Sequence, residues 1–157
     1  MALTRINNQA LPTLDADKLP SGSIIQVKTY TGTAQKQKDN SAYLDVISGS
    51  ITPTSTSSKI LMTFTGRMYI AGHSSELLSK FLRDSTELET YNSVFSGPSG
   101  DRMASAGSHE YVDSPSSTSS ITYKYQIKSG SASYDAYINP NGASDGTYVL
   151  KLMEIAG

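Results

Sequence analysis

The chain contains no cysteine and no tryptophan, and only 17% of its 157 residues are charged. Without cysteine, neither a disulfide nor a thiolate metal site can form. No apolar run approaches the ~20 residues that a membrane-spanning helix needs. The opening Met-Ala-Leu-Thr-Arg-Ile-Asn-Asn also lacks the charged start and apolar run of a secretory signal. The sequence therefore predicts a soluble protein without a classical export signal.

Neither sign of charge predominates in the chain. The 13 Lys and Arg residues and the 14 Asp and Glu residues are dispersed, and the net charge is −1. A protein that binds nucleic acid needs a stripe of basic side chains to neutralise phosphates. We therefore expect no nucleic-acid partner.

Material for a hydrophobic core is scarce. Hydrophobic residues make up 37% of the chain, and Ser, Thr and Asn are abundant. This composition fits either disorder or many short strands joined by polar turns, and regular alternation along several segments favours strands. The aromatic residues are 10 Tyr, 3 Phe and no Trp. Because Tyr packs its ring while its hydroxyl stays hydrogen-bonded, this preference together with a thin core favours an oligomer.

The clearest strand signal lies at residues 121–128, where apolar and polar residues alternate without a break. Successive side chains of a strand point to opposite faces, so one face of this segment should be buried. The Ser129-Gly130-Ser131 segment then supplies a turn, and residues 134–139 are expected to return as the antiparallel partner. The predicted core face consists of Ile121, Tyr123, Tyr125 and Ile127.

Strand-like segments recur at spacings of ~8–12 residues, which is typical of an all-β sandwich. Residues 76–83 are ambiguous, because Leu77, Leu78, Phe81 and Leu82 would also suit a short helix; the surrounding strands favour a strand. With eight or nine strands and no convincing helix, we expect an antiparallel β-sandwich of jelly-roll kind. The other predicted strands are 24–30, 43–51 (interrupted by Ser48-Gly49-Ser50), 59–70, 87–95, 102–112 and 147–155, and the main loops are 31–41, 96–101 and 140–146.

Residues 1–20 differ from the rest and are expected to form an extended N-terminal arm, followed by the sandwich at 21–157. No period of 2 or 3.6 survives across Pro12. The segment is either a frayed terminus or an anchor that becomes ordered when it docks on a partner. The candidate anchor residues are Leu3, Ile6, Leu11, Leu14 and Leu19.

Five phrases of the chain, taken in order, resemble a widespread β-rich domain of tailed-bacteriophage virion proteins, found in tail fibres, head fibres and decoration proteins. The resemblance covers about residues 19–157. The phrases are Leu-Pro-Ser-Gly-Ser-Ile-Ile-Gln-Val at 19–27, Ile-Thr-Pro-Thr-Ser-Thr-Ser-Ser-Lys-Ile-Leu at 51–61, Leu-Arg-Asp-Ser-Thr at 82–86, Tyr-Val-Asp-Ser-Pro-Ser-Ser-Thr-Ser-Ser-Ile-Thr-Tyr-Lys at 111–124 and Leu-Met-Glu-Ile-Ala at 152–156.

The resemblance implies a structural protein of a phage, a homotrimeric jelly-roll-like sandwich on the virion surface with no catalytic residues and no cofactor. Larger members carry the domain at the end of a long shaft, whereas here only residues 1–20 precede it. This suggests a head fibre, a decoration protein or a short appendage, made in the host bacterial cytoplasm and attached to capsid or tail proteins through its arm.

Residues that could carry chemistry are few. The two histidines, His73 and His109, come with no sequence motif of a serine hydrolase, since Gly-Pro-Ser-Gly at 97–100 is not a nucleophile elbow. The loop 139–146 offers oxygen ligands but lacks the alternating acidic residues of a calcium site. We expect neither enzyme activity nor a bound metal. Nothing in the sequence pairs the carboxylates that a glycosidase would use: Glu110, Asp113, Asp135 and Glu154.

The rival interpretation is a host-recognition adhesin, in which the loops 31–41, 96–101 and 140–146 bind a cell-surface glycan. Tyr134, Tyr137 and Tyr148 could stack on sugar rings if they shared a face. Tyr134 and Tyr137 have opposite parity on one predicted strand, so regular geometry separates them. Packing in the core or at a trimer seam is therefore the preferred role of these tyrosines.

Overall fold

Ten strands form in the computed structural model, which describes residues 19–72, 75–96 and 103–157. A single 3₁₀ turn, η2 (Gly142–Asp145), lies in the last loop of this part of the chain. The strands are β1 (Ile24–Gly32), β2 (Lys36–Lys38), β3 (Leu44–Ile51), β4 (Lys59–Ile70), β5 (Ser75–Arg83), β6 (Thr86–Phe95), β7 (Met103–Asp113), β8 (Ile121–Ser129), β9 (Ala136–Ile138) and β10 (Tyr148–Ile155).

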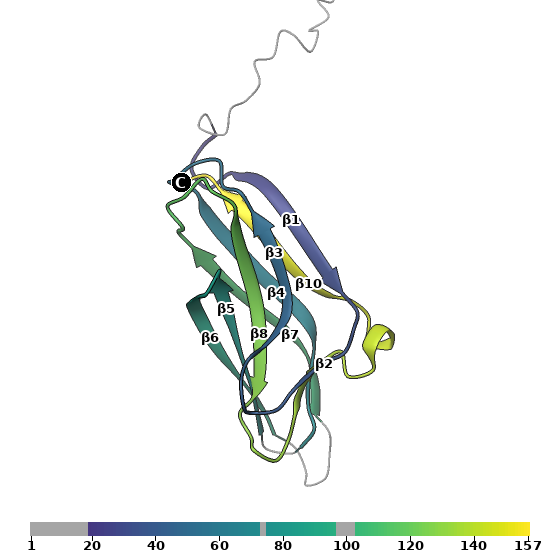
Figure 1. Ribbon diagram of the computed structural model, residues 1–157. Coiled ribbons are helices and arrows are strands. Elements are labelled where there is room, and N and C mark those ends of the chain that lie inside the picture. The colour runs from purple at the N-terminus through teal and green to yellow at the C-terminus, as the bar shows by residue number, and fades with distance from the viewer. Residues whose placement is uncertain (1–18, 73–74, 97–102) are drawn as a thin grey trace, which may run out of the picture.

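Two antiparallel sheets pack into a sandwich (Figure 1). In the first sheet, β4 pairs with β7 along one edge, and with β10 and then β9 along the other; β1 continues beyond β10 and β2 beyond β9. The second sheet has the order β3-β8-β5-β6. When the three-residue strands β2 and β9 are left out, the other eight strands can be renumbered 1 to 8 in chain order. The first sheet then has the order 1-8-3-6 and the second sheet has the order 2-7-4-5. This is the strand order of a jelly roll, so the predicted fold class is confirmed.

The core lies between the sheets, and β8 supplies one of its walls. Ile121 is 5% exposed, and Tyr123, Tyr125 and Ile127 are fully buried. The Tyr125 ring stacks on Phe64 of β4, with centroids 3.7 Å apart and ring planes 8° apart. The face that alternation marks on β8 therefore points into the interior and joins the two sheets.

The expected hairpin between 121–128 and 134–139 is wrong. β8 is flanked on its two edges by β3 and β5, whereas β9 lies in the other sheet between β4 and β2. After β8 the chain crosses to the opposite layer, and Gly130 donates its backbone N–H to Glu76 O. β3 and β5 each pair with β8 over at least seven residues, so they leave no free edge for the three-residue β9.

The expected loop at 31–41 is also partly wrong, because it contains the end of β1 and all of β2. The Lys-Gln-Lys sequence of β2 has no apolar alternation to announce a strand. It becomes a strand by pairing with β9, whose own position depends on β4. Tertiary pairing, and not local preference, therefore creates this element.

The ambiguous segment 76–83 is a strand, as predicted. Leu77 and Phe81 are fully buried, as a period of two requires. The register with β6 shifts between Phe81 and Leu82, and Leu82 is also buried at 8% exposure. This bulge explains why two adjacent apolar residues imitate the pattern of a helix.

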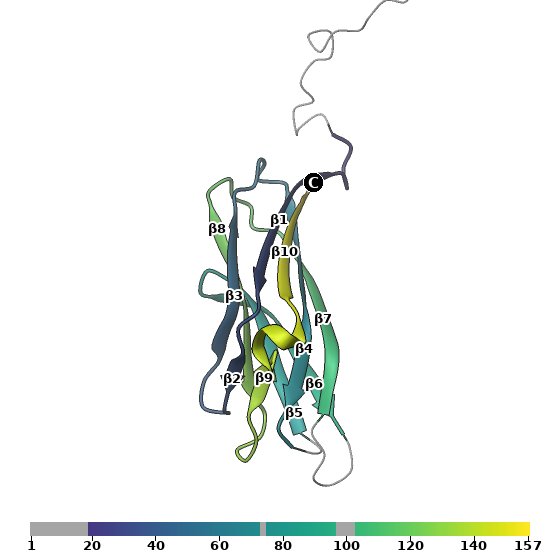
Figure 2. The same ribbon diagram turned by 90° about the vertical axis from the view of Figure 1, so that its right-hand side faces the viewer.

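The sandwich has two unlike ends (Figures 1 and 2). The terminus end holds residues 19–23 and 156–157 together with the connections 52–58 and 114–120. Backbone hydrogen bonds from Gly22 N to Ala156 O and from Ala156 N to Ser23 O, both 2.8 Å, join the first described residues to the last. The distal end holds β2, β9, the connections 39–43 and 130–135, and, at its side, the loop 139–147.

Candidate functional site

Glu154 ties the terminus end together. Its carboxylate is fully buried and accepts hydrogen bonds from Gln26 Nε2 at 2.6 Å and from the backbone N–H and hydroxyl of Thr54 at 2.6 and 2.7 Å. Burial alone would raise the pKa of this carboxyl, but the donors outweigh burial and the pKa lies below its usual value. These bonds connect β10, β1 and the 52–58 connection, so the role of Glu154 is structural.

Asp113 closes a second buried network nearby. Arg83 Nη1 lies 3.0 Å from both carboxylate oxygens, and the Tyr123 hydroxyl donates to Oδ2 at 2.7 Å. Burial, followed by this hydrogen bond, raises the pKa of Tyr123. Asp113 and Glu154 flank Ile60 in one cross-strand row of the first sheet. Both are buried and held by donors of the protein itself, which leaves no opening for a sugar between them.

His109 belongs to a partly buried polar cluster between the sheets. Its Nδ1 lies 2.7 Å from the Tyr125 hydroxyl and 3.1 Å from Ser79 Oγ, and its Nε2 lies 3.5 Å from Ser93 Oγ. Tyr91 stacks on the ring with centroids 4.2 Å apart. Burial lowers the pKa of His109. Since Ser79 is fully buried, its hydroxyl cannot reach a substrate, and the cluster is a hydrogen-bonded part of the core.

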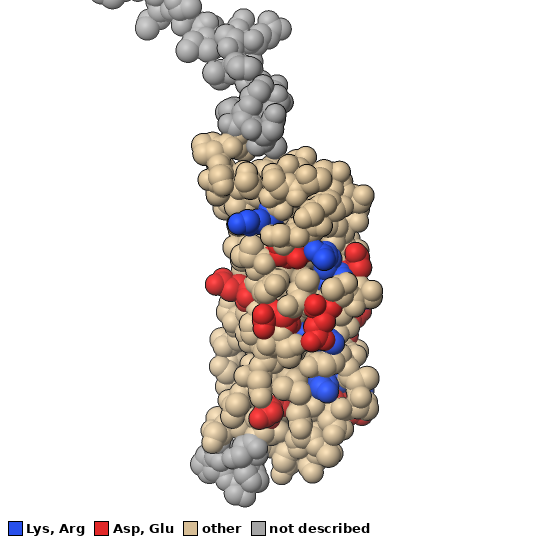
Figure 3. Space-filling model, turned by 90° about the vertical axis from the view of Figure 1, so that its left-hand side faces the viewer, with Lys and Arg blue, Asp and Glu red and all other residues tan. Residues whose placement is uncertain are grey.

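The surface on the β6 side carries charges of both signs. Figure 3 shows acidic and basic side chains intermixed over the middle of this face, with uncharged surface toward both ends. Lys80 of β5 and Glu87 of β6 form an ion pair at 2.7 Å. This face offers no continuous basic patch for a phosphate backbone.

A hollowed, partly polar surface that suits a small ligand lies on the outer face of the first sheet, toward the distal end. Tyr69 of β4 stands in register with Ala104 of β7 on one side and with Tyr137 of β9 on the other. All three point outward, because Met68, Ile70 and Ile138 fill the core. The tyrosine rings meet edge to face, with centroids 5.3 Å apart and a 68° angle.

A cavity of about 390 Å³ opens above this row; we call it the Tyr137 cavity. Its size lies within the range of about 300–1,000 Å³ that is typical of small-molecule sites. The small side chains of Ala71 and Ala104 leave the space that larger residues would fill. The lining consists of Gln35, Arg67, Tyr69, Ala71, Ala104, Tyr137, Pro140 and Asn141.

Asp145 positions two residues of the cavity rim. Its carboxylate accepts from Arg67 Nη1 at 2.5 Å and from the backbone N–H and side-chain amide of Asn141 at 2.7 and 3.0 Å. The pKa of Asp145 is lowered, chiefly by the Asn141 backbone donor and also by Arg67. Its side chain is 2% exposed, whereas that of Arg67 is 46% exposed. The buried carboxylate therefore orients a guanidinium that still reaches solvent.

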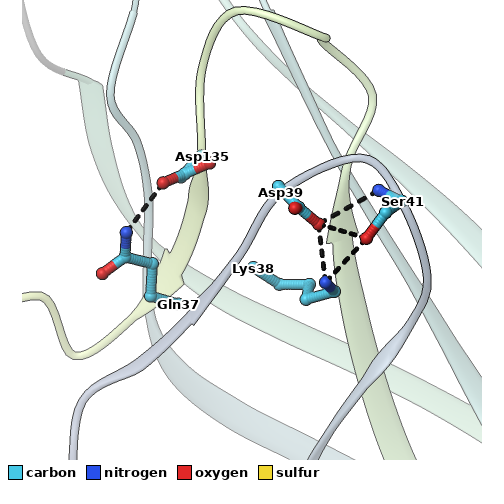
Figure 4. Close-up of polar contacts among 5 residues, drawn as sticks. All are labelled: Gln37, Lys38, Asp39, Ser41 and Asp135. Atoms are coloured by element: carbon cyan, nitrogen blue, oxygen red, sulfur yellow. Dashed lines mark hydrogen bonds and ion pairs between the residues drawn. The ribbon is translucent and has the colours of Figure 1, made fainter.

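Two further polar clusters lie on β2, on the connection after it and on the segment before β9 (Figure 4). Gln37 Nε2 donates to Asp135 Oδ2 at 2.7 Å. Lys38 Nζ lies 2.6 Å from Asp39 Oδ1 and 2.8 Å from Ser41 Oγ, and the hydrogen bond from Lys38 is the first cause of the lowered pKa of Asp39. The Asp39 side chain is 57% exposed. These groups are accessible to a partner, and exposed pairs of this kind stabilise a fold only weakly.

The structure gathers some of the predicted site residues and separates others. Gln35 and Asn141, from two of the three predicted adhesin loops, meet at the Tyr137 cavity. Tyr148 is 3% exposed and Tyr134 packs against the core, so the predicted trio of tyrosines does not form one stacking surface. Sequence reasoning missed Arg67 and Tyr69; the outward parity of Tyr69 on the long strand was the available signal.

The candidate anchor is described only at its last residue. Leu19 is half-buried at the terminus end and lines a small cavity of about 130 Å³ with Ile25 and Ala156. His73 lies outside the described residues, and so do residues 97–101 of the predicted adhesin loop 96–101. So do the remaining anchor residues Leu3, Ile6, Leu11 and Leu14.

The described residues contain no cluster of three or more acidic or histidine side chains suited to a metal ion. In the loop 139–146, the Asp145 oxygens are taken by Arg67 and Asn141. Among the same residues, no helix has the length and apolar character needed to cross a bilayer.

No protein-family model matches the chain, and no curated protein matches it. Solved structures resemble it distantly. The structure of infectious bursal disease virus Gt strain gives a TM-score of 0.41 at 14% identity, and the Gx strain gives 0.43 at 13%; each match covers 86% of this chain. The chain spans 39% of those viral chains. A mitogen from Yersinia pseudotuberculosis gives 0.25 at 13% identity over 84% of this chain and 86% of its own. At these TM-scores the fold assignment rests on the strand pairing of this chain itself.

Proposed function

We propose that this chain is a non-enzymatic structural protein displayed on the surface of a tailed-bacteriophage particle, as a head fibre, a decoration protein or a short appendage. The observation that carries the proposal is the polarity of the sandwich. Residues 19 and 157 lie at one end, and the Tyr137 cavity and the exposed polar clusters lie toward the other. A domain attached through its terminus end presents its distal end to the surroundings.

Four of the five phrases that resemble virion-surface domains support this polarity, because they lie at the terminus end, and the fifth, 82–86, is bonded to one of them. Residues 19–27 and 152–156 pair as β1 and β10, and 51–61 joins them through Thr54 and Glu154. The turn in 82–86 is bonded to Thr122 of the phrase 111–124, since Asp84 N donates to Thr122 O at 2.7 Å. The resemblance is therefore concentrated where attachment is proposed.

The arm, residues 1–20, is proposed to bind the particle through its scattered apolar side chains. The resemblance further implies a homotrimer, in which three arms would convert weak single contacts into strong attachment. Light scattering on the purified chain measures this assembly: a mass of three chains supports the trimer, and a mass of one chain removes it.

Removal of the arm tests the attachment itself. A chain without residues 1–20 should keep its strand content and thermal unfolding, and should no longer be incorporated into particles when it is supplied during infection. A full-length variant with Ser in place of Leu3, Ile6, Leu11 and Leu14 should behave in the same way. Normal incorporation of this variant in place of wild-type chain would remove the anchor role.

A further inference from the structure

The Tyr137 cavity is built by strands that the eight-stranded jelly roll does not require. β2 and β9 have three residues each and pair with each other, and β9 pairs with the end of β4 at Met68–Ile70. β9 brings Tyr137 to Tyr69, and the segment before β2 brings Gln35 to the rim. The two additions therefore turn an open sheet face into a walled cavity.

The walls combine an aromatic ring with flat hydrogen-bonding groups. The amides of Gln35 and Asn141 each offer both a donor and an acceptor, and Arg67 offers donors. Neighbouring hydroxyls of a sugar are both donors and acceptors, so a side-chain amide can pair with two of them. The C–H face of a pyranose ring is apolar and can pack on Tyr137, as an aromatic side chain with a polar tip allows.

The charge at the cavity favours an uncharged ligand. Arg67 is paired with Asp145, so the guanidinium and the carboxylate compensate each other at the rim. Among the cavity residues no other side chain is charged. An acidic sugar would gain little attraction from a cation that already has its anion, whereas hydroxyl groups can still use the exposed N–H groups of Arg67.

We propose that the Tyr137 cavity binds a neutral hexopyranose unit of a glycan. Tyr137 packs against the sugar ring, Gln35 and Asn141 bond to its hydroxyls, and Arg67, held by Asp145, donates to one of its oxygens. None of these residues lies in the five phrases that resemble virion-surface domains. The site is therefore independent of attachment: loss of the arm leaves sugar binding intact, and loss of the cavity leaves incorporation intact.

The test is titration of the full chain with free glucose, galactose, mannose and their disaccharides. Binding is measured from the changes in amide chemical shifts in NMR spectra. Glucuronate and sialic acid serve as acidic comparators. At least one neutral sugar should shift resonances of the cavity lining with about millimolar affinity. Q35A and N141A should each weaken that binding about three- to tenfold, and Y137A by about tenfold or more.

Q37A is the matched control. Gln37 lies two residues from Gln35 and is also exposed, but it bonds to Asp135 and does not line the cavity. Q37A should bind the sugar as wild type does, and all variants should unfold at similar temperatures. The proposal is overturned if no neutral sugar shifts the cavity resonances, if acidic sugars bind more tightly, or if Q35A and Q37A behave alike.

Discussion

Both ends of the sandwich contain hydrogen-bonded carboxylates, but these are buried at the terminus end and lie at the surface at the distal end. At the terminus end, Glu154 and Asp113 are buried, and their oxygens accept donors from other strands and connections. At the distal end, Asp39 and Asp135 accept equally short hydrogen bonds, but at the surface. A buried carboxylate must keep its donors or destabilise the fold, whereas an exposed one can exchange them for water or a partner. The carboxylates of the terminus end are therefore needed for stability, whereas those of the distal end remain accessible.

This contrast coincides with the distribution of the family-like sequence. The phrases that resemble phage virion domains surround Glu154 and Asp113, and the residues of the Tyr137 cavity lie outside them. The end at which attachment is proposed therefore carries the sequence that resembles virion-surface domains, and the distal end carries the residues outside that resemblance.

The largest loss of stability is expected from the core on which both ends depend. Tyr125→Ser removes a fully buried ring that stacks on Phe64, and it should lower the free energy of unfolding by about 3 kcal/mol. Urea denaturation followed by far-UV circular dichroism measures the change. A loss below ~0.5 kcal/mol, the size of an ordinary surface substitution, would contradict the inward face of β8.

Asp113→Ala should cost somewhat less, about 2 kcal/mol, because Arg83 and the Tyr123 hydroxyl lose their acceptor in a buried site. The Arg83 side chain is 30% exposed and can recover some hydration, which keeps the cost below that of a fully buried pair. Thermal and urea unfolding give the value. If D113A unfolds like wild type, the terminus end is not held by this network.

Glu154→Gln should cost about 1 kcal/mol at neutral pH, since one acceptor remains while the amide places a donor against Gln26. The folded state lowers the pKa of Glu154 below its ordinary value of 4.5, so the carboxylate stabilises the fold above that pH. This contribution disappears as the pH falls through the lowered pKa. The difference between wild type and E154Q should therefore shrink in urea titrations below about pH 4.5. A constant difference would mean that the charge does not matter.

Asp135→Ala should have the smallest effect, below ~0.5 kcal/mol, because its partner Gln37 is exposed and can bond to water. The same unfolding measurements apply, with D113A as the comparison at the other end. A cost equal to that of D113A would mean that the carboxylates at the two ends contribute equally to stability.

The sequence alone was sufficient for the fold class and most strands, because alternation with a period of two records which face is buried. Ile121 to Ile127 show this most clearly. Alternation says nothing about which strand lies next to which. The wrong pairing of 134–139 followed, since the edges of β8 are taken by β3 and β5, which come from distant parts of the chain.

The candidate site could be predicted only in part for the same reason. Two of its loops were identified from their polar residues, but Tyr69 and Tyr137 meet only because β9 pairs with β4. The expected interruption of 43–51 at Gly49 is likewise absent. The strand continues, and the Tyr30 ring occupies the space of the missing Cβ, with its hydroxyl bonded to Ser50. Gly49, which the sequence alone indicates as a break in the strand, instead makes room for the ring of Tyr30 from β1.

The position of β10 between β1 and β4 has a consequence for biosynthesis. This strand, Tyr148–Ile155, is translated after every other described strand, yet it contributes Leu150 and Leu152 to the core and both neighbours of β10 need it as a partner. While β10 is still inside the ribosome, β1 has no partner in its sheet, and the apolar side chains of the earlier strands that pack against β10 stay exposed. The sandwich can close only once β10 has been synthesised, and pairing of such distant segments is slow. Nascent chains of this protein should therefore depend on chaperones until β10 has paired with β1 and β4.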